Sequence, residues 1–128
     1  SIIEFNDKDS IVRAPYGQGI FKKIINDTMN NEEFDKLKIR LMNEGNKFFD
    51  IPMDKYDLDV VISLNNYHAG YAAVAHNPCL TIPIGLRKSN EPAGITFIGK
   101  SFSEQLLYEI GLYFEESYEG RVPPKNSN

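Results

Sequence analysis

The sequence predicts an α/β fold, in which short apolar strands are interleaved with helices. Three apolar runs, at residues 59–64, 79–84 and 95–98, have the length and composition of strands. Apolar residues recur at helical spacing over residues 30–49 and 104–114. Alternation of these two periodicities along one chain is typical of strands covered by helices.

Composition limits the classes of function. The chain has 128 residues, of which 41% are hydrophobic, enough for the core of one domain. Mean hydropathy is −0.38, and no apolar run approaches the roughly 20 residues that span a bilayer. A net charge of −4 argues against nucleic acid as the main partner, because phosphate binding needs a concentrated basic face. We therefore expect a single domain with neither nucleic acid nor membrane as a partner.

One cysteine, Cys79, excludes an internal disulfide and makes the cytoplasm the default setting. The sequence opens on Ser1 without an initiator Met or a visible secretory signal. We therefore expect a piece of a longer protein.

Residues 1–30 are expected to form a docking arm. An amphipathic turn is predicted over residues 2–6, and an apolar stripe predicts a helix over residues 18–26. Pro15 suits a first helical turn, where its missing N–H removes no hydrogen bond.

The clearest predicted helix begins after Asn30 or Asn31, either of which can cap it ahead of two glutamates. It is expected to run to Phe49 and to stop before Pro52, because proline disrupts a helix interior. Gly45 within it is either a weak point or a position of close packing.

Residues 59–64 predict a continuous apolar strand covered on both faces. A polar loop over 65–68 and a short helix over 70–76 should follow it. The other two strands form a hairpin joined through residues 88–92. Three strands this apolar make a poor isolated sheet, and their uncovered edges predict that they belong to a larger one.

The last helix is expected to be capped by Ser101 or Ser103, with a capping box between Ser101 and Glu104. Gly120 is expected to end this helix, and a flexible tail from Pro123 onward should follow. Its buried stripe is expected to comprise Leu106, Leu107, Ile110, Tyr113 and Phe114.

Several short motifs, in order, extend along nearly the whole chain. Asn6 and the run Ala-Pro-Tyr-Gly-Gln at 14–18 come first, and Tyr-Asp-Leu-Asp-Val-Val-Ile follows at 56–62. The C-terminal pattern comprises Pro78, Thr81, Pro83, Gly85, Pro92, Gly94, Gly99, Glu104, Leu106 and Leu107. Together these motifs closely resemble the C-terminal part of amidase-signature enzymes.

The resemblance implies that the chain is a three-strand piece of the family's large mixed sheet, flanked by helices. It also implies hydrolysis of a small-molecule amide by the intact enzyme, without a cofactor, through a Ser–cis-Ser–Lys triad. No residue here matches that triad, so no catalytic residue is assigned and the chain alone is expected to be inactive. The short link from residue 70 to Asn77 resembles stand-alone bacterial-type amidases more than the A subunit of glutamyl-tRNA amidotransferase.

A different class of function stays open. The chain would then be a non-catalytic remnant or interaction module, whose sheet edges pair in a homodimer or with a separate N-terminal amidase half.

Asn65, Asn66, Tyr67 and His68 are the candidate substrate-binding residues of the intact enzyme. They follow a predicted strand at its carboxyl end, where ligands of open α/β sheets bind. The competing interpretation is a turn satisfied by its own Asn side chains.

Other reactive side chains are assigned structural roles. His68, His76 and Cys79 match no familiar zinc spacing, so no metal site is predicted, and Cys79 is expected to be a small buried residue. Lys100 and the serines that follow it look like a catalytic pair, but their position fits a strand end and a helix cap.

Overall fold

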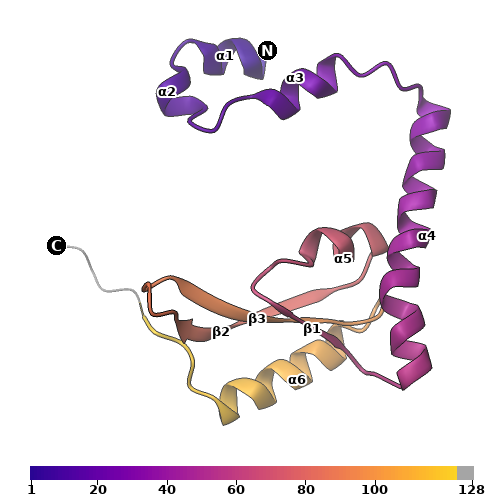
Figure 1. The fold of residues 1–128 in the computed structure, drawn as a ribbon, viewed down its shortest axis with the longest axis vertical. Coiled ribbons are helices and arrows are strands. Elements are labelled where there is room, and N and C mark those ends of the chain that lie inside the picture. The colour runs from indigo at the N-terminus through magenta and orange to yellow at the C-terminus, as the bar shows by residue number, and fades with distance from the viewer. Residues whose placement is uncertain (124–128) are drawn as a thin grey trace. The chain divides into compact units, whose positions relative to one another are not determined.

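The computed structural model describes residues 1–123, so the predicted tail lies outside the described residues except for Pro123. The chain divides into two compact units, the first ending at Lys36 and the second beginning at Leu37. Each unit is described by itself. Figure 1 shows the order of the helices and strands along the chain.

The first unit contains α1 (Ile2–Asp7), α2 (Ser10–Arg13) and α3 (Gly19–Ile25). The predicted helix over residues 18–26 is therefore present as α3. The expected turn over residues 2–6 is instead helix α1, which begins with a capping box between Ser1 and Glu4.

Pro15 does not begin a helix, contrary to expectation. Ala14, the residue before it, has φ −141° and ψ 56° and ends α2, because a residue before proline is driven out of the helical region. A turn through Gly17 then leads to Gln18, which is 8% exposed. The Gln18 side chain accepts a hydrogen bond from Asn6 at 2.9 Å, and this bond holds the start of α3 against α1.

Helix α4 (Asn31–Tyr56) has the predicted cap. The Asn30 Oδ1 atom accepts from the Glu33 N–H at 3.0 Å, and the Glu33 carboxylate accepts from the Asn30 N–H at 3.2 Å. These two bonds form a capping box.

The expected end of this helix before Pro52 is wrong, because α4 continues through the proline to Tyr56. Phe49 and Met53 flank Pro52, and both are fully buried. Burial of two such side chains stabilises the folded chain by about 3–6 kcal/mol. That offsets the cost of roughly 3 kcal/mol for a proline inside a helix.

The sheet contains β1 (Val61–Leu64), β2 (Cys79–Leu86) and β3 (Pro92–Ile98) in the order β1-β3-β2. Both pairings are antiparallel, and Ile98 of β3 lies opposite Val61 on one side and Cys79 on the other. The predicted combination of helices with a three-strand sheet is confirmed.

Helices α5 (Ala69–Ala75) and α6 (Glu104–Ser117) lie on opposite faces of this sheet (Figure 1). Two clusters of buried side chains result. One comprises Phe49, Met53, Ala72, Ala75 and Ile98, and the other comprises Ile82, Phe97 and Leu107.

Strand β1 is covered on one face only, although its apolar run predicted two covered faces. Ser63 is buried at 4% exposure, and Val61 packs against the cluster around Phe49. Ile62 and Leu64, on the other face, are 60% and 47% exposed. Helix α6, which covers that face of the sheet, packs against β2.

The predicted capping box of α6 is absent. Ser103 occupies the N-cap position, but its hydroxyl donates to the Lys100 carbonyl at 2.6 Å and makes no side-chain cap bond. The Ser101 hydroxyl donates to the His76 carbonyl at 3.0 Å, and this bond ties the start of α6 to the end of α5.

The buried face of α6 is narrower than predicted. Leu107 and Gly111 are buried, whereas Tyr113 is 75% exposed. The helix ends at Ser117, before the expected stop at Gly120. Gly120 is buried against β2 instead, and a Cβ atom there would lie 2.6 Å from the Pro83 carbonyl oxygen.

Candidate functional site

The predicted site residues follow β1 directly, and the first of them is engaged in the sheet. The Asn65 N–H donates to the Gly94 carbonyl at 2.7 Å, and the Gly94 N–H donates to Asn65 Oδ1 at 2.8 Å. The hydroxyl of Thr96 donates to the Asn65 carbonyl. Asn65 has φ +50°, a conformation that asparagine tolerates better than most residues. Its amide oxygen therefore extends the pairing between β1 and β3.

Tyr67 combines an exposed ring with a hydrogen-bonded hydroxyl. Hydrogen bonding to the Arg87 guanidinium is the largest cause that lowers the pKa of this phenol, and hydrogen bonding to the Asn65 side chain lowers it further. The same contact raises the pKa of Arg87, whose guanidinium also lies 3.9 Å from the Glu91 carboxylate. Tyr67 is thus fixed at its polar end, while 63% of the residue stays exposed.

His68 is oriented through one nitrogen of its ring. Its Nδ1 atom lies 2.8 Å from the hydroxyl of buried Ser63, so Nε2 is the nitrogen that can meet a ligand. The ring stacks on Phe48 at 6.3 Å between centroids, with an interplanar angle of 21°. Phe48 in turn stacks on Tyr71 at 5.6 Å and 24°.

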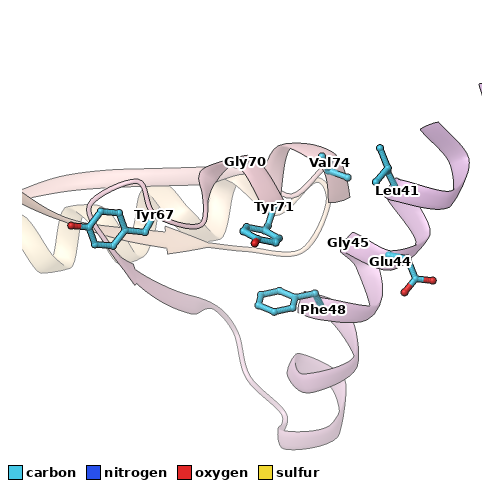
Figure 2. A pocket seen from close by; sticks show the side chains of 8 residues that line it. All are labelled: Leu41, Glu44, Gly45, Phe48, Tyr67, Gly70, Tyr71 and Val74. Carbon is cyan, nitrogen blue, oxygen red and sulfur yellow. The ribbon is translucent and has the colours of Figure 1, made fainter. Parts of the chain in front are cut away.

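Phe48 and Tyr71 line an open, largely apolar cavity of about 430 Å³ between α4, α5 and the loop after β1. Figure 2 shows Phe48 and Tyr71 facing the hollow between the two helices, with the Glu44 carboxylate turned toward the outer side of α4. The volume is within the range of small-molecule sites. The residues that line it include Leu41, Gly45, Phe48, Tyr67, Tyr71 and Val74.

The four predicted residues are divided between two places. Tyr67 lines the apolar cavity, and His68 stacks on Phe48, which also lines it. Asn65 and Asn66 line a second hollow of about 350 Å³, together with Thr81, Pro83 and Gly94. The structure therefore does not bring the amide side chains and the aromatic side chains into one pocket.

Phe48 and Tyr71 were not predicted as site residues. Phe48 fits the apolar stripe of α4, so the sequence pattern places it in the core, yet it is 52% exposed. A sequence signal does exist, since Leu41, Gly45 and Phe48 recur at helical spacing with a glycine between two large side chains. Such a pattern lets a second helix approach closely at the glycine, with the two large side chains on either side of the contact.

The structure corrects the environment of Cys79. It was expected to be buried, but it begins edge strand β2 and is exposed. The thiol itself is partly desolvated, and this burial raises its pKa, which disfavours the reactive thiolate.

Lys100 has a structural partner. Its ammonium group pairs with the Asp54 carboxylate, and that hydrogen bond raises the pKa of Lys100.

Among the residues that the structure describes, no group of three or more His, Cys, Asp or Glu side chains has the arrangement of a metal site. No described helix is both long enough and apolar enough to cross a bilayer.

Comparisons of the sequence and of the fold with known proteins both identify amidases and related amidotransferase subunits. No protein-family model matches the sequence. The chain is 28% identical over 123 residues to an Arabidopsis thaliana protein named "Probable amidase", a match that covers 95% of this chain and 23% of the relative. It is 34% identical over 62 residues to the A subunit of the glutamyl-tRNA(Gln) amidotransferase of Zymomonas mobilis, a match that covers 48% of this chain and 13% of that protein.

Comparison of the fold with solved structures also identifies amidases, and the match covers more of this chain than the sequence matches do. The crystal structure of an amidase family protein from Bacillus anthracis matches 98% of this chain with a TM-score of 0.86 and 34% sequence identity. The match covers 25% of that protein, so the chain spans about a quarter of the length of these two amidases. The relatives of this chain are therefore amidases and an amidotransferase A subunit, which match the amidase-signature family that its C-terminal motifs predicted.

Proposed function

We propose that this chain is the C-terminal segment of an amidase that hydrolyses the C–N bond of small carboxamides. The observation that carries this proposal is the match to the Bacillus anthracis amidase family protein, at 34% identity over 98% of the chain. The Ser–cis-Ser–Lys triad belongs to the part of the family that this chain does not match. The segment alone is therefore inactive, and the intact enzyme needs no cofactor.

The role of the segment in that enzyme is to hold the substrate. The loop after β1 presents Tyr67 and His68 beside an apolar cavity large enough for a small amide. The rings of Phe48 and Tyr71 accommodate the apolar part of the substrate, and His68 Nε2 binds its amide group. Asn65 positions the loop, because its side chain is engaged by Gly94 and Tyr67.

A second function is supported by the uncovered face of β1. A non-catalytic module that pairs with a second copy, or with a separate amidase half, would also bury Ile62 and Leu64. The cytoplasmic setting stays a prediction under either proposal.

The decisive experiment is an amidase assay on this chain alone and after mixing with the catalytic portion of the Bacillus protein, using a panel of aryl and alkyl amides. We expect hydrolysis only in the mixture, above the level of the catalytic portion alone. Tyr71→Ala should then reduce kcat/KM for aryl amides, whereas Tyr108→Ala, a similarly exposed aromatic change on α6, should not.

Two results would contradict the proposal. Hydrolysis by the isolated chain would show that it contains a nucleophile of its own. A mixture that forms a complex but never exceeds the activity of the catalytic portion alone would favour the non-catalytic module.

A further inference from the structure

Ser63 and His68 form a side-chain pair whose surroundings decide where its protons lie. The Ser63 Oγ atom is 2.8 Å from His68 Nδ1, and Ser63 is buried at 4% exposure. A buried hydroxyl hydrogen that has no acceptor is costly, because it has given up its hydrogen bond to water. The acceptor that this hydrogen finds therefore determines which nitrogen of the neutral imidazole carries a proton.

The neutral pair can be arranged in two ways, and only one of them satisfies the hydroxyl well. If Nδ1 donated to Ser63, the hydroxyl hydrogen would turn to the Leu64 carbonyl, which is 3.5 Å away. An O–H···O bond is usually roughly 2.5–3.0 Å long. The Leu64 carbonyl also already accepts from the Tyr67 N–H. If the hydroxyl donates to Nδ1 instead, its acceptor lies at 2.8 Å, and the imidazole proton is on Nε2.

The imidazole is held on one edge and on one face. Ser63 belongs to β1, which pairs along its whole length with β3. The His68 carbonyl accepts from the Ala72 N–H at 3.0 Å, which anchors the residue at the start of α5. The ring stacks on Phe48 and lies 6.1 Å from the ring of Tyr71, measured between centroids. These contacts fix the direction of the Nε2 atom.

The Nε2 edge of the ring is open. His68 is exposed, and within residues 1–123 no group pairs with its Nε2 atom. Tyr67 and Gly70, which lie close to His68 in the chain, both line the apolar cavity. A few polar groups at fixed positions beside an apolar cavity are what orients a ligand in a small-molecule site. A fixed, unpaired N–H group therefore stands next to the candidate cavity.

We propose that Ser63 is a positioning residue that holds His68 as an Nε2–H donor, and that this donor binds the carbonyl oxygen of an aromatic carboxamide. The inference rests on the proposed function for the identity of the ligand. The carbonyl oxygen is chosen over the –NH₂ group because two donors cannot pair. The aromatic group is chosen because Phe48 and Tyr71 line the cavity (Figure 2) and flank the imidazole.

The first test is the tautomer of His68 in this chain, read from the ring nitrogen shifts by NMR in mildly alkaline solution, where imidazole is neutral. We expect the proton of His68 on Nε2 alone. His76, the other of the two histidines, is the internal reference, because its ring has no hydrogen-bond partner in the described part of the chain. Ser63→Ala should shift His68 to the mixture of tautomers that His76 shows.

The second test is a titration of this chain with benzamide, followed by the Nε2 signal of His68 and the ring signals of Phe48 and Tyr71. Benzamide should shift all of them. Benzylamine has a similar aromatic ring but is a cation without an acceptor at neutral pH. It should leave the Nε2 signal unchanged while it shifts the ring signals.

Three variants separate the hydrogen bond from the packing of the ring. His68→Leu should weaken benzamide binding by about three- to tenfold, the effect of one neutral hydrogen bond. His68→Gln keeps an N–H donor and should restore most of that loss. His76→Asn is the matched control, because asparagine tolerates the positive φ of +60° at this position, and its affinity should be unchanged.

A mixture of tautomers for His68 in the unmodified chain would overturn the role of Ser63. Unchanged benzamide affinity in folded His68→Leu, or an equal Nε2 shift with benzylamine, would overturn the carbonyl assignment. If both tests succeed but the mixture with the catalytic portion hydrolyses no amide, this inference stands and the amidase function is rejected. If the mixture hydrolyses aryl amides and His68→Leu leaves kcat/KM unchanged, the amidase function stands and this inference is rejected.

Discussion

Gly45 of α4 lies so close to Ala75 of α5 that a Cβ atom on Gly45 would be 2.8 Å from the Ala75 Cβ and 3.0 Å from its backbone nitrogen. This close approach sets the spacing of the two helices beside the apolar cavity. Gly45 was predicted to be either a weak point in the helix or a position of close packing. The structure shows the second.

Gly45→Ala should destabilise the chain despite the better helix propensity of alanine. The propensity gain is about 1 kcal/mol, whereas overpacking against a backbone that cannot move aside costs about 1–3 kcal/mol. Chemical denaturation monitored by circular dichroism should show a lower midpoint. Gly70→Ala is the control, because a Cβ at Gly70 meets no atom within 4 Å and should be neutral or stabilising.

Asn65 substitutions should divide its contribution into two parts. Asn65→Ala loses the acceptor for the Gly94 N–H and places alanine at a positive φ, so we expect a loss of about 1–3 kcal/mol. Asn65→Gly also loses the acceptor for the Gly94 N–H, but glycine adopts a positive φ without strain. Its loss of stability should therefore be smaller than that of Asn65→Ala.

Thermal unfolding measures both Asn65 variants against Asn66→Ala, an exposed neighbour that should change stability by less than about 0.5 kcal/mol. Equal losses for Asn65→Ala and Asn66→Ala would show that Asn65 does not anchor the loop.

Arg87→Gln should raise the pKa of Tyr67 toward the ordinary tyrosine value, because the guanidinium that favours the phenolate is gone. A titration by NMR with labelled tyrosine resolves this residue from the other six tyrosines. Lys88→Gln, the adjacent cation, should leave the Tyr67 titration nearly unchanged.

The same contact has a defined effect on stability. A lowered folded-state pKa contributes stability above the unfolded tyrosine value of about 10, and that contribution is lost as the pH falls through the folded value. Arg87→Gln should therefore cost more stability in strongly alkaline solution than at neutral pH. If Arg87→Gln lowers the free energy of unfolding equally at both pH values, the contribution of Arg87 comes from packing and not from its effect on the phenolate of Tyr67.

Cys79 should react slowly with iodoacetamide at neutral pH although it lies on an edge strand. Partial burial raises the pKa of its thiol, so the thiolate fraction is smaller than in a free cysteine. The pH dependence of alkylation measures this directly, and an apparent pKa below the usual value of about 8.5 would contradict it. Cys79→Ser should leave the activity of the complemented enzyme unchanged.

The sequence predicted the elements with strong local signals. The Asn30 cap, the three strands and the short helix α5 all depend on residues within a few positions of one another. The continuation of α4 through Pro52 could not be predicted, because it depends on where Phe49 and Met53 are buried in three dimensions. The missing capping box of α6 has a similar origin, since Ser101 bonds the end of α5.

The position of the loop after β1 was predicted from the sequence, and the role of its residues in substrate binding stays a prediction. The loop after β1 is where the residues were expected, and Tyr67 does line a cavity. Phe48 and Tyr71 were missed because helical periodicity assigns large apolar residues to a core. Which face of α4 stays open depends on the spacing that Gly45 sets with Ala75.

The missing N–H at Pro83 also limits the size of any assembly that this sheet can form. A sheet with two open edges adds strands at both ends and grows into a fibre, as cross-β stacks do. With the β2 side closed by proline and the Gly120 segment, any further strand would have to pair with β1. Two copies that paired β1 to β1 would therefore form a closed twofold pair with no open edge left to extend.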